Sequence, residues 1–271
     1  MYLTRHQTAS GPRWAFSGHF LPPSLSLALL LELPQPALAA ALQAAVTPTL
    51  ADGPLLAPLE ALHEVWACGV TYLRSRDARK AESEVADVYE KVYTAARPEI
   101  FFKSIGWRVV GHGAPIRIRA DSTWDVPEPE LTLVVNRHRE IVGYCAGNDV
   151  SSRSIEGENP LYLPQAKTYT GACALGPGLR LASAAELADL PIGIEIWRQG
   201  ALAFQGETST KSMNRPLEVL VSYLSRELDF PHGVFVMTGT GVVPGDNFTL
   251  QAADRVRIAV GAVTLENEVQ A

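Results

Sequence analysis

The stretch WDVPEPELTLVVN, Trp124 to Asn136, joins two glutamates to a run of strand-forming residues. Leucine and β-branched residues at 131–135 predict a strand. Side chains alternate between the two faces of a strand, so Glu128 and Glu130 are expected to project to the same side. Two like charges on one face repel each other. Either that face is exposed to solvent, or a cation lies between the two carboxylates.

A third carboxylate, Asp149, ends the next strand-like run, IVGYCAGNDV (141–150). A hairpin or a neighbouring pairing of the two runs would bring Asp149 beside the glutamate pair. His138, in the turn NRHRE between the runs, is expected to face solvent. The group would then offer oxygen ligands only, which favours Mg²⁺ or Mn²⁺ over zinc. An E-x-E pair alone is a weak signal, since most such pairs are solvated strand ends.

Outward from these two runs, most of the second half of the chain shows short strand-like segments separated by turns. Helices are expected at SAAELA (183–188) and RPLEVLVSYLSRELD (215–229). A charged helical pattern also covers SRDARKAESEVADVYEKVYTAA (75–96) ahead of Pro98. Many short strands with few helices predict a β-rich α+β fold rather than a doubly wound sheet.

The first sixty residues are lower in charge and richer in Ala, Leu and Pro than the rest. YLTRHQ and RWAFSGHF predict two short strands. The leucine-rich run at 25–34 predicts a helix that continues past its prolines to residue 46. A Pro-rich connector at 47–61 predicts a domain boundary, so we expect a small amino-terminal α/β domain at 1–60 and a catalytic domain at 61–271. The run at 25–34 is too short to span a bilayer and lacks the features of a targeting signal.

Composition excludes several classes of protein. The 271 residues are 47% hydrophobic, which is enough for a sizeable core, and the net charge of −6 without a basic run argues against nucleic-acid binding. Three widely spaced cysteines, Cys68, Cys145 and Cys173, indicate a reducing cytoplasm and buried structural thiols. No P-loop, dinucleotide fingerprint or G-x-S-x-G elbow occurs, so nucleotide use, a nicotinamide cofactor and serine hydrolysis lack support.

Other residues could carry chemistry, each with an ordinary alternative. Lys167, among aromatic and apolar neighbours, is either a desolvated proton-transfer group or a surface lysine. Glu99, ahead of an apolar run, is either a base in an apolar pocket or the charged start of a strand. Lys103 follows that run and could neutralise an anionic substrate. The backbone N–H groups of MTGTGVVPGD (237–246) could hold a carboxylate, or form a plain turn.

Several motifs in order resemble the fumarylacetoacetate hydrolase superfamily across about residues 64–269. They are EVWACGVTY, RPEIFFK, PEPELTLVV, GNDVSSR, LPQAKTY and TGTGVVPGD. The resemblance implies a mixed β-sandwich roll and a Mg²⁺ site of Glu128, Glu130 and Asp149, with Mn²⁺ as a possible substitute. It further implies Lys167 as the active-site lysine, and Arg153 as a substrate-binding residue that supports the site from beside Asp149. Gly239 and Thr240 would lie near a substrate carboxylate.

RPEIFFK, VGHG, PEPEL and ENPLYLPQAK are similar, more narrowly, to the 2-keto-3-deoxy-D-arabinonate dehydratase branch. That likeness implies Mg-dependent dehydration of a 2-keto-3-deoxy-D-pentonate to 2,5-dioxopentanoate, with Glu99 sharing the proton work with Lys167. The D-arabinonate and D-xylonate routes of pentose catabolism converge on this substrate. Hydrolytic members commonly carry a lid histidine that activates water, and the corresponding segment here, TYLRSRDARKAES, has none.

Two rival interpretations stay open. One is a C–C hydrolase or decarboxylase acting on an acylpyruvate- or oxaloacetate-like substrate with the same metal. The other is a non-catalytic metal-binding or scaffold protein. Relatives are typically dimers, so the resemblance also implies a homodimer or a higher assembly.

Overall fold

The computed structural model describes residues 2–73 and 91–271. Its centre is the hairpin expected from the opening stretch: β8 (Pro129–Val135) pairs antiparallel with β9 (Ile141–Asp149), with Glu130 opposite Gly147. Every residue of both strands is buried. Their nearly continuous apolar composition is typical of strands that are covered on both faces.

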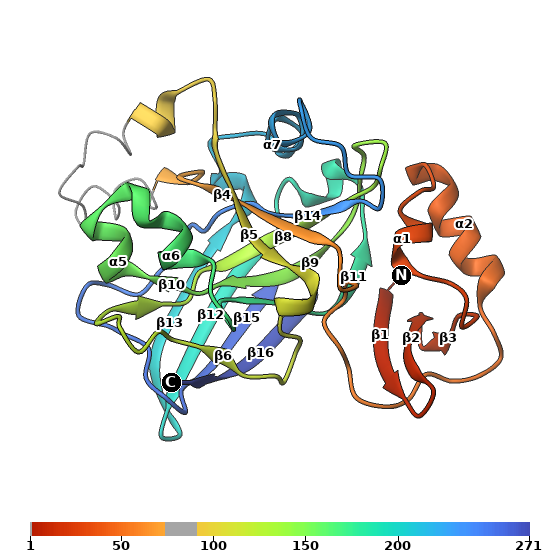
Figure 1. Ribbon diagram of the computed structural model, residues 1–271, viewed down its shortest axis with the longest axis horizontal. Helices are drawn as coiled ribbons and strands as arrows, with labels where there is room; N and C mark the ends of the chain where they lie inside the picture. Colours follow the sequence, from red (N-terminus) through yellow and green to blue (C-terminus); the bar gives the residue numbers. More distant parts are fainter. Residues whose placement is uncertain (1, 74–90) are drawn as a thin grey trace.

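This hairpin lies in the middle of a nine-stranded mixed sheet of order β3-β2-β1-β11-β9-β8-β14-β4-β5 (Figure 1). The other strands are β1 (Tyr2–Thr8), β2 (Gly11–Phe16), β3 (His19–Phe20), β4 (Glu64–Gly69), β5 (Glu99–Ile105), β11 (Cys173–Leu181) and β14 (Val234–Met237). All neighbouring pairs are antiparallel except β14 with β4, which is parallel.

A second sheet of order β13-β12-β15-β16-β6 packs against the first. Its strands are β6 (Ile116–Arg117), β12 (Pro191–Arg198), β13 (Ala201–Ser209), β15 (Arg255–Val260) and β16 (Val263–Gln270). Leu131 and Leu133 of β8 share one apolar core with Ile194 and Ile258 of the second sheet. Burial of this apolar surface is the main force that holds the two sheets together. The β-rich α+β prediction is confirmed.

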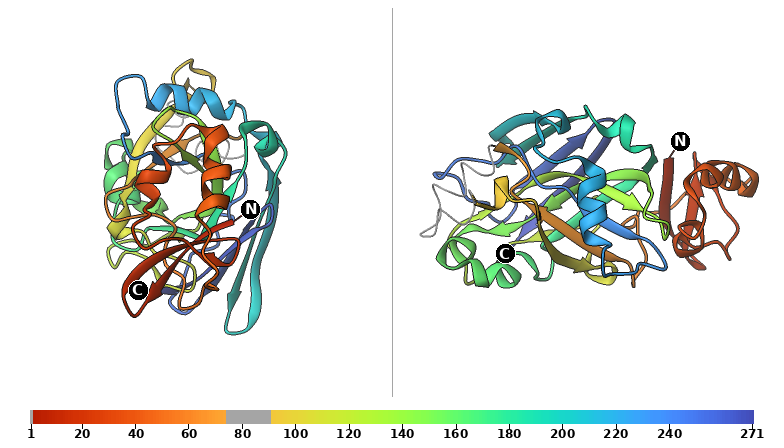
Figure 2. Two further views of the ribbon diagram at one scale, coloured as in Figure 1. Left: turned by 90° about the vertical axis from the view of Figure 1, so that its right-hand side faces the viewer. Right: turned by 90° about the horizontal axis from the view of Figure 1, so that it is seen from above.

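The amino-terminal segment extends the large sheet, because β1 pairs with β11 through Tyr2 and Arg180. It forms one end of the molecule (Figures 1 and 2). The single helix expected to run through residues 25–46 is wrong: α1 (Leu27–Leu30) and α2 (Gln35–Ala45) are separate helices. Pro34 lies between them with extended backbone angles, and proline interrupts a helix because it lacks an N–H donor.

The remaining helices are short. They are α5 (Arg153–Glu158), α6 (Leu163–Lys167), α7 (Leu217–Leu224) and the 3₁₀ turns η1 (Gly106–Arg108), η2 (Pro160–Tyr162), η3 (Ala184–Leu187) and η4 (Thr210–Ser212). The short strands β7 (Asp125–Val126) and β10 (Ser151–Ser152) form a separate pair. At the end of the molecule away from the amino-terminal segment lie α5 and α6 (Figures 1 and 2).

The later helices and the three cysteines were among the features that the sequence predicted. The helix expected at 215–229 is present only in part, as α7, and SAAELA forms the 3₁₀ turn η3 in place of the expected helix. Most of the charged segment at 75–96 lies outside the described residues. The three cysteines are buried and free, as expected. None of the helices in the described ranges is long and apolar enough to cross a membrane.

Candidate metal centre

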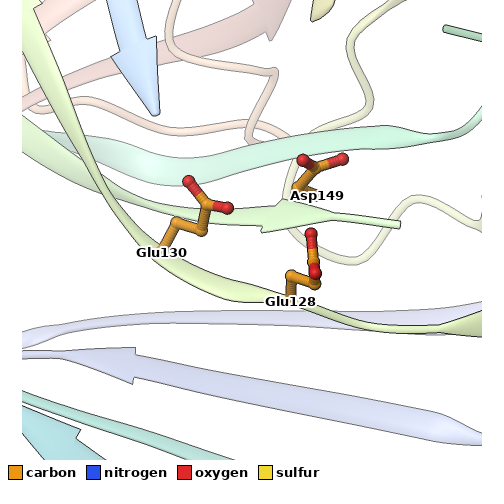
Figure 3. A group of neighbouring side chains, drawn as sticks. All are labelled: Glu128, Glu130 and Asp149. Carbon is orange, nitrogen blue, oxygen red and sulfur yellow. The ribbon is translucent and has the colours of Figure 1, made fainter. Parts of the chain in front are cut away.

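Three carboxylates converge at one end of the central hairpin. Glu128 precedes β8, Glu130 lies within it, and Asp149 ends β9. Each residue offers an oxygen within 4.8 Å of the others, and the three side chains point toward one another in Figure 3. All three residues are at most 3% exposed. The predicted proximity of Asp149 to the glutamate pair is confirmed, and the antiparallel hairpin is its cause.

Two lysines contact these carboxylates from α6 and β5. The Nζ of Lys167 contacts Glu128 and Asp149, the latter at 3.0 Å, and donates to Ser151 Oγ at 2.6 Å. The Nζ of Lys103 contacts the other oxygen of Asp149 and donates to the carbonyls of Val150 and Lys167. Lys103 and Lys167 are 1% and 2% exposed, so both ammonium groups depend on these partners in place of water.

An arginine holds the outer side of Glu128. Arg153, at the start of α5, places Nη2 2.7 Å from Glu128 and Nη1 2.8 Å from Glu156. Charge-assisted bonds of this kind are short and directional, so the guanidinium holds the carboxylates of Glu128 and Glu156 in fixed positions on either side of it. Glu156 was not anticipated as a site residue. Its position three residues after Arg153 on a short helix is the signal that could have indicated it.

Glu130 is held differently from the other two carboxylates. The N–H of Gly239, in the loop after β14, donates to its Oε2 at 2.7 Å. Burial raises the pKa of Glu130 well above its ordinary value, and the charges of Asp149 and Glu128 raise it further. A carboxylate in this position is costly to ionise unless a cation is shared among the three.

The carboxylates open onto a pocket at the ends of β4 and β5. Lys167, Glu99, Glu156, Phe101, Gly239 and Thr240 also line it. The structure therefore brings Glu99 together with Lys167, the two residues expected to carry proton transfer. The described polar contacts of Lys103 and Arg153 are with protein carboxylates and carbonyls, and neither residue lines this pocket.

The chemistry of the site suits a hard divalent cation. The three converging side chains provide oxygen ligands only, which is the preference of Mg²⁺. Five acidic and three basic side chains of the described residues surround the site, so their formal charges sum to −2. A divalent cation would balance that excess. The basic side chains are Lys103, Lys167 and Arg153, and the acidic ones are Glu99, Glu128, Glu130, Asp149 and Glu156.

A mixed β-sandwich roll with an oxygen-only carboxylate site at its central hairpin defines a class of metal-dependent enzymes. The family described as "Fumarylacetoacetate (FAA) hydrolase C-terminal" matches residues 64–270. The chain belongs to this family.

Similar proteins point to one branch of it. The chain is 48% identical over 214 residues to the "Probable 2-keto-3-deoxyxylonate dehydratase" of Haloferax volcanii, covering 78% of this chain and 73% of that protein. It is 43% identical over 208 residues to the 2-dehydro-3-deoxy-D-arabinonate dehydratase of Saccharolobus solfataricus. That match covers 74% of this chain and 69% of that protein. A solved structure of 2-keto-3-deoxy-D-arabinonate dehydratase complexed with magnesium and 2,5-dioxopentanoate superposes with a TM-score of 0.83. Its sequence is 32% identical, and the match covers 100% of this chain and 99% of that one.

Proposed function

We propose that this protein is a Mg-dependent hydro-lyase that dehydrates a 2-keto-3-deoxy-D-pentonate to 2,5-dioxopentanoate. The observation that carries the proposal is the buried Lys167 ammonium against two of three clustered carboxylates, in a pocket that Glu99 also lines. The likeness to dehydratases over most of the chain supports the same reaction.

Glu128, Glu130 and Asp149 are the proposed metal ligands, and their oxygen-only chemistry suits Mg²⁺ or Mn²⁺. When bound, the metal supplies Lewis acidity, which stabilises the negative charge that appears on the 2-keto acid as its C3 proton leaves. Lys103 and Arg153 hold Asp149 and Glu128 by direct ion pairs. Their proposed role is thus to position ligands rather than to contact the substrate.

Lys167 and Glu99 are the proposed proton-transfer pair. One takes the C3 proton, and the other protonates the C4 hydroxyl, which departs as water. The unsaturated alcohol then tautomerises to 2,5-dioxopentanoate. Two ionisable groups in one pocket titrate as a pair, so the base and the acid are assigned to the pair jointly. Exclusion of water from the buried site strengthens every charge interaction in it.

The loop after β14 is the proposed location for the substrate carboxylate. Gly239 and Thr240 line the pocket next to the carboxylate cluster. The Gly239 N–H is directed to Glu130, and Thr240 Oγ1 donates to the Val242 carbonyl at 3.0 Å. A carboxylate only accepts hydrogen bonds, so the Thr240 hydroxyl would bind it by turning its proton from the Val242 carbonyl to the substrate.

The test is turnover of 2-keto-3-deoxy-D-xylonate by the purified protein with Mg²⁺ and with EDTA, measured as formation of 2,5-dioxopentanoate. Metal-dependent product is expected. An acylpyruvate and oxaloacetate, tested under the same conditions, would detect C–C bond hydrolysis and decarboxylation, the two alternative reactions. Cleavage of one of these without dehydration would replace the dehydratase proposal by a hydrolase or a decarboxylase.

The proposal also covers the oligomeric state of the protein and its location in the cell. The likeness to family members supports a homodimer or a higher homo-oligomer, which sedimentation would test. Three buried free cysteines suit a reducing compartment, so we propose a cytoplasmic location.

A further inference from the structure

The end of β4 carries a glycine directly beside the Glu99 side chain. In the antiparallel pair of β4 and β5, Gly69 lies opposite Glu99. A Cβ atom added to Gly69 would lie 2.0 Å from Glu99 Oε2 and 2.5 Å from its Cδ. These separations are well below van der Waals contact, so the Glu99 carboxyl group occupies the space that any other residue's side chain would need.

Backbone conformation does not explain this glycine. Glycine is usually needed where φ is positive, and Gly69 is not one of the positive-φ glycines of the described chain. A glycine inside a strand also weakens it, because it costs conformational entropy and packs no side chain. What distinguishes position 69 is therefore space, and the group that uses the space is the carboxyl of Glu99.

The residue after Gly69 also has an unusual backbone conformation and lines the same pocket. Val70 has φ of 52°, a left-handed conformation that is rare for a β-branched residue, and it lines the pocket with Gly69 and Glu99. Backbone strain of this kind clusters at functional sites, where surrounding contacts maintain it. The end of β4 is thus shaped around the pocket at two consecutive residues.

We infer that Gly69 is a positioning residue: its missing side chain lets the Glu99 carboxyl lie across the end of β4 and into the pocket that holds Lys167. The inference rests on the proposed function, in which Glu99 shares proton transfer with Lys167. A side chain at position 69 would displace the carboxyl from its place in this pocket and leave the metal ligands at the ends of β8 and β9 in place.

The test is a double-mutant cycle on the Mg-loaded protein with Gly69→Ala, Glu99→Gln and the double variant. Glu99→Gln is expected to lower kcat about 10²- to 10⁴-fold, the usual contribution of a positioned acid or base. Gly69→Ala is expected to lower kcat at least about tenfold, with KM and Mg²⁺ affinity within about twofold of the parent. The double variant should be no slower than Glu99→Gln alone, because residues that act as a unit are not additive.

A matched control is Gly193→Ala in β12. That glycine also lies in a strand, but an added Cβ would find its nearest atoms at 3.9 Å, an ordinary contact. It should keep the parent's kcat. A second variant, Gly69→Ala with Glu99→Asp, moves the carboxyl back by one carbon, which is expected to lessen its overlap with the added Cβ. It should fold and match the kcat of Glu99→Asp, even if Gly69→Ala alone is unstable.

The outcomes separate the inference from the proposed function. Parental kcat in Gly69→Ala, alongside a loss in Glu99→Gln, would overturn the positioning role of Gly69 and leave the dehydratase proposal intact. Losses that multiply in the double variant would also overturn it. Parental kcat in Glu99→Gln would remove Glu99 from the proposed chemistry, and the role of Gly69 with it.

Discussion

At the scale of single residues, Lys167 links the metal site to proton transfer. Its Nζ contacts Glu128 and Asp149, so it competes for the oxygens that a metal would use. We predict that Lys167→Met lowers kcat about 10²- to 10⁴-fold. Mg²⁺ affinity should not fall, because the substitution removes a cation from the ligands. Calorimetric titration of the metal and steady-state kinetics would check both parts.

Lys211 provides the matched control for that prediction. It is a surface lysine whose Nζ lies 3.6 Å from Asp189, and its side chain is 76% exposed. Lys211→Met should leave both kcat and Mg²⁺ affinity unchanged. A loss of metal binding in Lys167→Met would contradict the proposal, because it would mean that the ammonium organises the carboxylates.

Asp125 predicts a pH dependence of stability. It is buried, its Oδ1 has no hydrogen-bond partner among the described residues, and burial raises its pKa to about 6. A carboxyl with a raised pKa binds its proton more tightly in the folded state than in the unfolded one. Its contribution to stability is present below its ordinary pKa, near 4, and is lost as pH rises through about 6.

Asp125→Asn removes that loss, since the amide does not ionise. The difference in unfolding free energy between the variant and the parent should therefore grow in favour of the variant. Between pH 4 and pH 7 it should grow by an amount on the order of 1–2 kcal/mol. Urea denaturation at several pH values would measure it. Asp121→Asn is the control with the opposite sign, because its bond to Arg119 lowers the pKa of Asp121. Parallel stability profiles for Asp125→Asn and the parent would contradict the prediction.

At the scale of elements, the ends of β4 and β14 are tied together behind the site. Thr71 Oγ1 donates to the Thr238 carbonyl at 2.6 Å, and the next residue, Gly239, donates its N–H to Glu130. We predict that Thr71→Val costs about 1–3 kcal/mol of stability, because a buried acceptor loses its donor. Mg²⁺ affinity should also fall, since Gly239 is then less firmly held against Glu130.

Thr71→Ser keeps the hydroxyl and serves as the comparison. It should bind Mg²⁺ like the parent and lose less stability than Thr71→Val in thermal unfolding. Equal metal affinity in the Ser and Val variants would show that the tie between β4 and β14 does not position Glu130.

The elements differ in how far their residue patterns predicted them. β8 and β9 were expected at 131–135 and 141–150, and β12, β14, β15 and β16 belong to the short strand-like segments expected in the second half of the chain. β11 was not expected, because its sequence CALGPGLRL contains Gly-Pro-Gly, which ordinarily marks a turn. A register shift between Gly176 and Arg180 accommodates that interruption inside the sheet. β13, with three exposed residues at its start, lacks the apolar run that would have indicated it.

At the scale of the whole molecule, the amino-terminal segment shares a core with the large sheet. Leu3, Trp14 and Phe16 belong to the same apolar cluster as Val142 and Leu179 of β9 and β11. The division into domains at residues 1–60 and 61–271 stays a prediction. Because the two parts share this core, we expect deletion of residues 1–60 to leave apolar surface exposed and to abolish cooperative unfolding.

Circular dichroism and thermal unfolding of the shortened chain would check this expectation. Trp14→Ala in the full chain is the milder companion. It should cost about 3–5 kcal/mol, as large-to-small substitutions in cores do, with kcat unchanged because Trp14 lies at the end of the sheet away from the pocket. A shortened chain that unfolds cooperatively and turns over substrate would contradict the shared-core expectation and support an independent domain at 61–271.

The residue pattern alone predicted the β-rich class, the central hairpin and the carboxylate group at its end. These follow from local regularities: alternation places Glu128 and Glu130 on one side, and one short turn brings Asp149 back beside them. Ordered motifs also indicated the family, which the match over residues 64–270 shows.

The pairing of the charges around that group became visible only in the three-dimensional arrangement of the elements. Lys103, Arg153 and Glu156 come from β5 and α5, and the space above Gly69 exists only because β4 and β5 pair in one register. Contacts between segments far apart in the chain depend on packing and register rather than on local preference. For this reason the positions of Lys103 and Gly69 against the site residues had no signature in the residues next to them.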